Sequence, residues 1–240
     1  ITKKTRKRQE ELDKVRIDIT FDNDLKIETK YLTINPKVDV SYELSVPRYL
    51  LLKNIHTSNG RIDIEDAGKV ENVKTSNGAI TLRKCSGSIL AETSNGSIDA
   101  GEIDGSVYAH TSNGKIKLQN IHGVGDARTS NGSIQIYNVT TVENTKTSNG
   151  SIKVQLKDLP ADTNISTQNG TITLYLAKNL NANISASTSN GRIQLHDYPV
   201  LASEISKSYV NGSVGKGGKL LTVSTSNAGI HIYDDEKIEY

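Results

Sequence analysis

The sequence predicts an all-β protein: a single-stranded β-solenoid of about ten coils of 18–21 residues, with an Asn-Gly ladder at one corner and an N-terminal β cap. Three observations predict it. A tetrapeptide returns at a fixed period, apolar and polar residues alternate after each copy, and the composition is poor in large rings. A repeat this short cannot bury an apolar face alone, so successive copies must stack.

The tetrapeptide Thr-Ser-Asn-Gly sets the period. Six copies follow one another every 18 residues, two more follow at longer spacing, and two degraded copies end the array. In the last copy, Ala228 is interpreted as an inserted residue. The ten units begin at Thr57, Thr75, Thr93, Thr111, Thr129, Thr147, Thr167, Thr188, Tyr209 and Thr225.

The alternation predicts the strands. Counted from the first residue of a unit, position 6 is isoleucine in the first eight units, position 8 is mostly Ile, Leu or Val, and positions 5, 7 and 9 are mostly polar. This period of two is typical of a strand with one buried face. A second patch at positions 15 and 17 predicts a second strand, and like strands would stack in parallel about 4.8 Å apart.

The composition fits a narrow interior. Apolar residues make up 35% of the chain, which has one Phe, no Trp and no Met. Side chains of Ile, Val and Ala fit inside so small a coil, and large rings do not. Cys85 is the single cysteine, which excludes an intramolecular disulfide. A net charge of +2 gives no reason to expect nucleic acid as a partner.

The corner motif predicts a structural ladder. Glycine would supply a positive φ, and asparagine tolerates the neighbouring left-handed region. The asparagine amides would bond from coil to coil, whereas a ligand-binding loop is the alternative interpretation. Asn227 is expected to matter less, because its unit is terminal. The ladder would contain Asn59, Asn77, Asn95, Asn113, Asn131, Asn149, Asn169 and Asn190.

Three segments are predicted along the chain. Residues 1–14 form a basic tail or linker, with Arg6, Lys7 and Arg8 among its charges; the flank of a membrane helix and a nucleic-acid-binding arm are alternatives. Residues 15–56 alternate without the corner motif and are expected to cap the first coil, because an open solenoid end would aggregate. Residues 57–240 form the solenoid.

Little in the sequence indicates catalysis. It contains no nucleophile elbow, phosphate loop, dinucleotide fingerprint or zinc signature, so we expect no catalytic residue, metal or cofactor. Asp63 and Asp99 would lie about 9.6 Å apart, near the upper limit for inverting glycosidases. On an open strand face without a pocket they are expected to be surface charges. The scattered histidines are also expected at the surface: His56, His110, His122, His196 and His231.

Position 9 supplies a candidate ligand strip. It follows the buried position 8 and should therefore face solvent. Rings and amides gather there in the later units, where they could hold an extended sugar chain or a protein edge; a simple preference of Tyr for exposed strand positions is the alternative. The strip would consist of Tyr137, Gln155, Tyr175 and His196, with Tyr233 beyond them.

With these units laid out, the chain resembles the adhesin-like, or toastrack, β-solenoid repeat domains of bacteria and archaea. The resemblance rests on the repeated T-S-N-G-x-I turns and on a leading strand that ends in Val46-Pro47. It covers about residues 38–240. It implies a cell-envelope association, often through a membrane anchor or signal, with adhesion or scaffolding roles and no catalytic residues.

We therefore expect a non-enzymatic, rigid binding or scaffold module at the cell envelope, with a protein or glycan as partner. Because the chain starts at Ile1 rather than Met, an upstream segment could anchor it; a cytoplasmic location is the alternative. Two other classes of function stay open. One is a polysaccharide-cleaving solenoid enzyme, and the other is a structural subunit that assembles through its ends.

Overall fold

The computed structural model describes residues 2–5, 12–22, 24–34 and 38–238, and the chain divides into two compact units, Ile1–Val46 and Pro47–Tyr240. In the first unit, β1 pairs with β4 and β2 pairs with β3, both antiparallel. The predicted tail is therefore a strand at its start, while Arg6, Lys7 and Arg8 lie outside the described residues. The strands are β1 (Thr2–Thr5), β2 (Val15–Phe21), β3 (Leu25–Tyr31) and β4 (Val38–Ser41).

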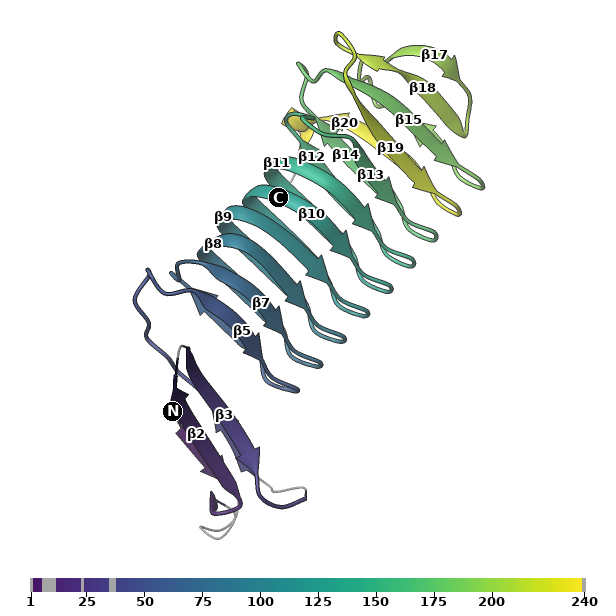
Figure 1. Cartoon of the computed structure of the whole chain (residues 1–240). Coiled ribbons are helices and arrows are strands. Elements are labelled where there is room, and N and C mark those ends of the chain that lie inside the picture. The colour runs from purple at the N-terminus through teal and green to yellow at the C-terminus, as the bar shows by residue number, and fades with distance from the viewer. Residues whose placement is uncertain (1, 6–11, 23, 35–37, 239–240) are drawn as a thin grey trace. The chain divides into compact units, whose positions relative to one another are not determined.

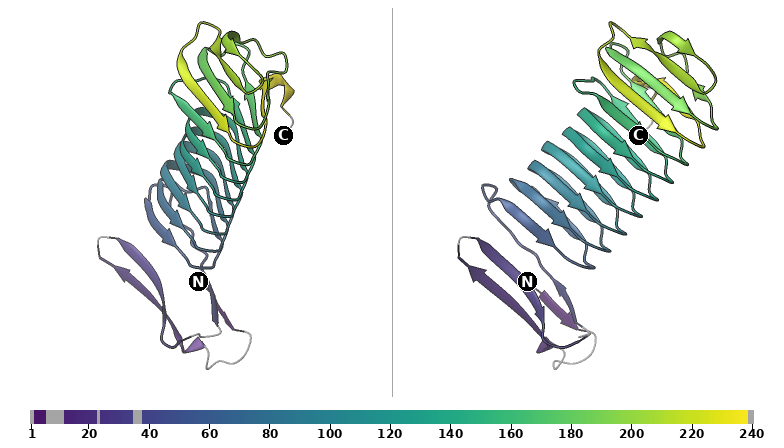
Figure 2. Two further views of the ribbon diagram at one scale, coloured as in Figure 1. Left: turned by 90° about the vertical axis from the view of Figure 1, so that its right-hand side faces the viewer. Right: turned by 45° about the vertical axis from the view of Figure 1, so that its right-hand side comes forward.

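The second unit is the solenoid (Figures 1 and 2). It begins earlier than predicted, because β5 already pairs in parallel with β7 at the 18-residue period, as in Leu52 with Val70. The boundary thus falls at Pro47 rather than after His56, and the capping role of residues 15–56 stays a prediction. The regular strands are β5 (Leu52–His56), β6 (Ile62–Glu65), β7 (Val70–Lys74), β8 (Ile80–Glu92), β9 (Ile98–His110), β10 (Ile116–Arg128) and β11 (Ile134–Lys146).

Each coil from β8 to β11 has one strand that bends at position 10, and in the coil before them the bend separates β6 from β7. Apolar side chains point inward on both sides of the bend, and Ile98, Ala100, Ile103, Val107 and Ala109 illustrate the pattern in β9. The bend residue is left-handed although it is not glycine. Its φ is 51–57° in Asp66, Lys84, Glu102, Asn120 and Asn138.

Threonine, asparagine and glycine each have a separate role at the Thr-Ser-Asn-Gly corner. The buried Thr129 hydroxyl donates to the carbonyl of Gly114 in the preceding coil (3.1 Å) and accepts from the N–H of Gly132 (3.2 Å). Asn131 Nδ2 donates to Asn113 Oδ1 (2.8 Å) on the exposed side. The predicted asparagine ladder is confirmed.

The reason predicted for the corner glycine is wrong. The described glycines with positive φ are Gly87, Gly105, Gly215 and Gly217, and none of them is a corner glycine. At Gly114 a Cβ would lie 1.8 Å from the carbonyl oxygen of Gly96. Glycine is favoured there because the backbones of stacked corners approach closely. Ala228 occupies the equivalent position in the unit that begins at Thr225.

The last coils keep the alternation of buried and exposed side chains, but their order in the stack differs from their order in the sequence. After β12 (Ile152–Leu156), β13 (Thr163–Ser166) and β14 (Ile172–Leu176), the chain leaves one layer empty and builds β15 (Ala182–Thr188) and β16 (Ile193–Gln194) beyond it. The antiparallel strands β17 (Leu201–Ile205) and β18 (Tyr209–Val214) extend the sheet past β15. The returning strands β19 (Lys219–Thr225) and β20 (Ile230–Asp234) fill the empty layer, and a 3-10 helix, Asp235–Lys237, follows.

This crossover changes the ladder. Asn227 lies between Asn169 and Asn190 and bonds to both, at 2.7 and 2.8 Å. The ladder thus joins nine asparagines, and the predicted terminal position of Asn227 is wrong. Ala228 is not an insertion, because Ile230 follows Thr225 by the usual five residues. The unit counted at Tyr209 is not a corner, since it lies within β18.

Candidate functional site

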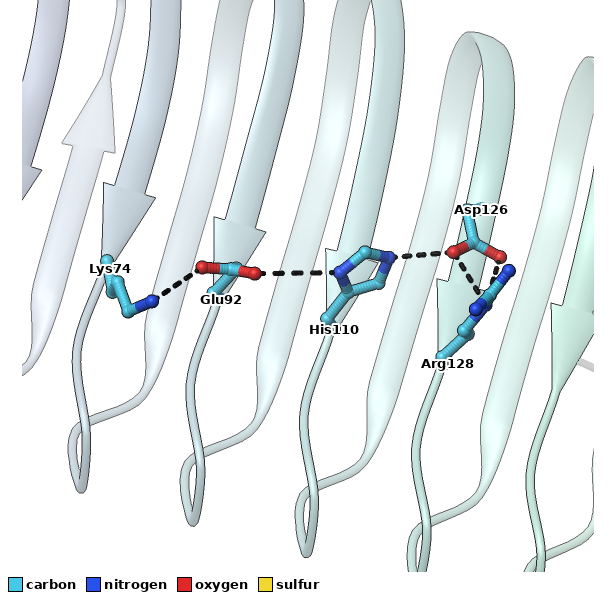
Figure 3. A network of polar contacts seen from close by, with 5 residues as sticks. All are labelled: Lys74, Glu92, His110, Asp126 and Arg128. Atoms are coloured by element: carbon cyan, nitrogen blue, oxygen red, sulfur yellow. Dashed lines mark hydrogen bonds and ion pairs between the residues drawn. The ribbon is translucent and has the colours of Figure 1, made fainter.

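Outward side chains near the ends of β7 to β10 form a continuous polar ladder along the solenoid (Figure 3). Lys74, Glu92, His110 and Arg128 each precede the threonine of a corner, so parallel pairing brings them side by side. Asp126 joins them from β10, two residues before Arg128, on the same face of the strand.

The contacts in this ladder join each carboxylate to a cation on one side and to His110 on the other. Lys74 Nζ lies 2.8 Å from Glu92 Oε2, and Glu92 Oε1 lies 3.7 Å from His110 Nδ1. His110 Nε2 is 2.8 Å from Asp126 Oδ2. Arg128 Nε is 2.7 Å from the Asp126 carboxylate, which also accepts a hydrogen bond from the amide of Asn144. We call Lys74, Glu92, His110, Asp126 and Arg128 the polar ladder.

The polar ladder is electrostatically balanced. On each side of His110 lies one carboxylate, which pairs in turn with one cation. The hydrogen bond from Lys74 holds the pKa of Glu92 below its usual value. Both ring nitrogens of His110 face carboxylates. Neither nitrogen is therefore left to activate a nucleophile, and the arrangement can hold side chains in place but lacks the geometry of a general base.

A shallow groove runs beside the polar ladder. It is lined by Lys74, Glu92 and His110 and by the threonine and serine that follow each of them, in three successive coils. The threonines are buried and bonded in the corners, whereas Ser76, Ser94 and Ser112 are exposed. An ammonium, a carboxylate and an imidazole group thus follow one another at the strand spacing, each in a coil with an exposed serine hydroxyl.

Tyr108 adds an aromatic ring to the same face. It lies on β9 two residues before His110 and is 38% exposed. Its ring covers the backbone of Gly125 in the next coil, where a Cβ would lie 2.5 Å from Tyr108 Cε1 and 2.6 Å from Cζ. Gly125 therefore provides the space for the ring. We call Tyr108, His110 and Asp126 the Tyr108 patch.

The predicted ligand strip is only partly accessible. Tyr137 and Gln155 are buried, at 7% and 3% exposure, so the expectation that they face solvent is wrong. Gln155 turns toward the preceding coil because its Oε1 accepts the N–H of Asn138, a donor left at the bend of that coil. Tyr175 and His196 are half-buried, and a role in binding a ligand stays a prediction for the strip.

Similarity to known proteins identifies the family of this chain. A model of the Toastrack DUF4097 family matches residues 3–233. The chain belongs to this family. No curated protein and no solved structure matches it. The family assignment agrees with the Thr-Ser-Asn-Gly coils and with the parallel stacking of the Toastrack solenoid.

The crossover of the Toastrack solenoid brings Tyr175, His196 and Tyr233 of the predicted strip together in a different order, with Tyr233 in the middle. Tyr233 on the inserted β20 stacks against Tyr175 on one side and His196 on the other, with centroids 5.6 and 4.0 Å away. His196 Nε2 also lies 2.9 Å from His231 Nδ1. Burial, and to a lesser degree the charge of His196, lowers the pKa of His231. The two histidines were expected to be separate because the order of the last layers was unknown.

Asp63 and Asp99, the acid pair that was expected to be surface charges rather than catalytic groups, each pair with an arginine. Asp63 Oδ1 lies 2.7 Å from Arg61 Nε, and Asp99 Oδ2 lies 2.8 Å from Arg83. Within the described ranges, no three His, Cys, Asp or Glu side chains are grouped so as to hold a metal ion. In the same part of the chain, no helix has the length and apolar composition needed to cross a membrane.

Proposed function

We propose that this Toastrack solenoid is a non-catalytic, adhesin-like binding module of the cell envelope, and that its Tyr108 patch and the adjoining groove contact a glycan. The observation that carries the proposal is the Tyr108 ring, seated over Gly125 beside fixed polar groups. A sugar ring presents an apolar C–H face and a hydroxyl rim, which match an exposed aromatic ring next to carboxylate, imidazole and hydroxyl groups.

The rigidity of the surface supports binding. The groups of the patch lie on paired strands, and the corners behind them are held by buried threonine bonds. A surface whose side chains are already fixed loses little conformational freedom when a partner binds. The non-catalytic part of the proposal is supported by His110, whose nitrogens both face carboxylates, and by the arginine partners of Asp63 and Asp99.

Binding of the purified chain to an array of envelope glycans tests this proposal. We expect Tyr108→Ala to lower binding at least tenfold, with the melting temperature nearly unchanged because the ring is a surface group. Gly125→Ala should also lower binding, since its methyl group displaces the ring without removing it. Tyr31→Ala, at a 57% exposed tyrosine of the first unit, is the matched control. Equal binding by the wild type and Tyr108→Ala would contradict the proposed surface.

The envelope location is supported by the resemblance to envelope-associated solenoids and needs its own test. In fractionated cells that produce the native protein, we expect the chain in the membrane or surface fraction. A purely cytosolic distribution would contradict the location and leave the binding surface untouched.

A further inference from the structure

The C-terminal strand pair fills a layer between two coils that precede it in the sequence. In Figure 1, β19 lies between β13 and β15, and β20 lies beside β14. On one face, β13 pairs with β19 and β19 with β15. On the other face, β14 pairs with β20 and β20 with β16. We call this layer, filled by residues 219–234, the slot.

The coils on the two sides of the slot, which we call its walls, pair with it in the same register: β13 and β14 form one wall, and β15 and β16 form the other. Val223 in β19 pairs with Ile165 of one wall and Ala186 of the other. Ile230 in β20 pairs in the same way with Ile172 and Ile193. Each wall therefore offers a parallel edge on both faces, although β16 supplies only Ile193 and Gln194. A segment must carry the spacing of a corner unit to pair with both walls at once.

The corner of the inserted segment is bonded to both walls as firmly as any regular corner. The Thr225 hydroxyl donates to the carbonyl of Gly170 (3.0 Å), and the Thr188 hydroxyl donates to the carbonyl of Ala228 (2.8 Å). Asn227 continues the asparagine ladder in both directions. These bonds recognise the corner sequence and do not depend on which molecule supplies it.

One short turn links the inserted segment to the strand before it. Gly215–Gly218 carries the chain from β18 back to β19, and two of its glycines have positive φ. Val214 and Lys219 both pair with Ala182, from opposite sides of β15. The turn therefore spans two strand spacings, about 9.6 Å.

From this arrangement we infer that the slot is a strand-acceptor site, and that residues 219–234 of a second copy of the chain can occupy it. Reciprocal exchange would give a strand-exchanged dimer. Every contact inside the slot would be the same as in the monomer, and only the link at Gly215–Gly218 would change its path. Exchange of an identical element is a low-cost route to a dimer for this reason.

Deleting Lys216, Gly217 and Gly218 tests the inference. One residue would remain between Val214 and Lys219, and two Cα–Cα steps reach at most about 7.6 Å. The segment could no longer return to its own slot, so we expect the mass in solution to double. Insertion of three glycines after Gly218 is the matched control and should leave a monomer. A folded, monomeric deletion variant would overturn the inference.

If the deletion variant does not fold, a second measurement tests whether the slot accepts a strand from another molecule. The full-length chain is unfolded and refolded in an excess of a labelled peptide covering residues 219–238. We expect the peptide to be captured at about one per chain. A peptide with Ile230→Lys and Ile232→Lys, two fully buried positions, should not be captured. No capture of the native peptide above this control would overturn the acceptor site.

Discussion

The regular coils and the C-terminal layers use the same corner but differ in how the chain connects them. From β8 to β11, each strand runs through its bend into the next patch without a loop, and each coil lies beside its neighbour in sequence. Between β14 and β15 the strand is broken by residues 177–181, and the next coil lies two layers away. The corner determines the register in which a coil pairs with its neighbours, whereas the connection determines the place of that coil in the stack.

This difference shows that the contacts of a corner depend on the layer beside it and not on the distance along the sequence. In both regions the corner threonine and asparagine meet equivalent groups of the adjacent layer. A substitution at a corner should therefore act through the neighbouring layer, whatever its distance in sequence. The predictions below follow that rule from the largest expected effect to the smallest.

The largest effect is expected at a corner glycine. In Gly114→Ala the new Cβ would lie 1.8 Å from the carbonyl oxygen of Gly96, so two paired backbones would have to separate. We expect a loss of about 3 kcal/mol in the free energy of unfolding, measured by chemical denaturation. Gly101→Ala is the control, because its Cβ would meet only flexible side chains at 3.4 Å or more. Equal effects of the two changes would contradict the close-approach explanation.

The next effect concerns the buried corner hydroxyl. Thr129→Val keeps the shape of the side chain but removes the donor to Gly114 and the acceptor for the N–H of Gly132. A buried N–H then loses its partner, and we expect a loss of about 2 kcal/mol. Thr129→Ser, which keeps the hydroxyl, should recover part of this. If valine and serine destabilise the chain equally, the hydroxyl bonds are not the cause.

The sequence was sufficient to predict the features that every coil repeats, but it was insufficient to predict the order of the last layers. The period and the isoleucines at position 6 predict the coil, its buried face and the asparagine ladder, because each is a property of one unit beside its copy. The order of the last layers depends on which edge the returning strand pairs with. Thr167, Thr188 and Thr225 carry equivalent corners, so the motif cannot distinguish them.

The candidate site was missed for a related reason. Tyr108 follows the strand pattern like any exposed residue, and its environment depends on Gly125 in the next coil, at a shifted register. In the sequence, the polar ladder appears only as four different residues at position 18 of successive units, namely Lys74, Glu92, His110 and Arg128. Tyr137 and Gln155 were assigned to the surface from their alternation alone, although the bend at position 10 changes which side chains are covered.

Asn227→Ala tests the crossover through stability. Because Asn227 bonds to Asn169 and Asn190, it occupies the interior of the ladder. Its bonds lie on the exposed side of the corner, so we expect a loss of about 1 kcal/mol, equal to that of Asn131→Ala. Asn59→Ala at the end of the ladder should cost about half as much. A loss at Asn227 as small as that at Asn59 would indicate a terminal position and contradict the crossover.

The smallest expected effect is a gain in stability, at the left-handed bend of the regular coils. Glu102 holds a φ of 56°, a conformation that asparagine adopts at lower cost than other side chains. The next two coils already carry Asn120 and Asn138 at this position, with Asn138 Nδ2 donating to Asn120 Oδ1 at 2.6 Å. Glu102→Asn would both relieve the backbone and extend this second ladder by one rung, and we expect a gain of about 0.5 kcal/mol in chemical denaturation. Glu143→Asn is the matched control, because Glu143 lies on a strand with ordinary φ, where asparagine is unfavourable. If both changes lower the stability, the left-handed bend is not what selects asparagine in the regular coils.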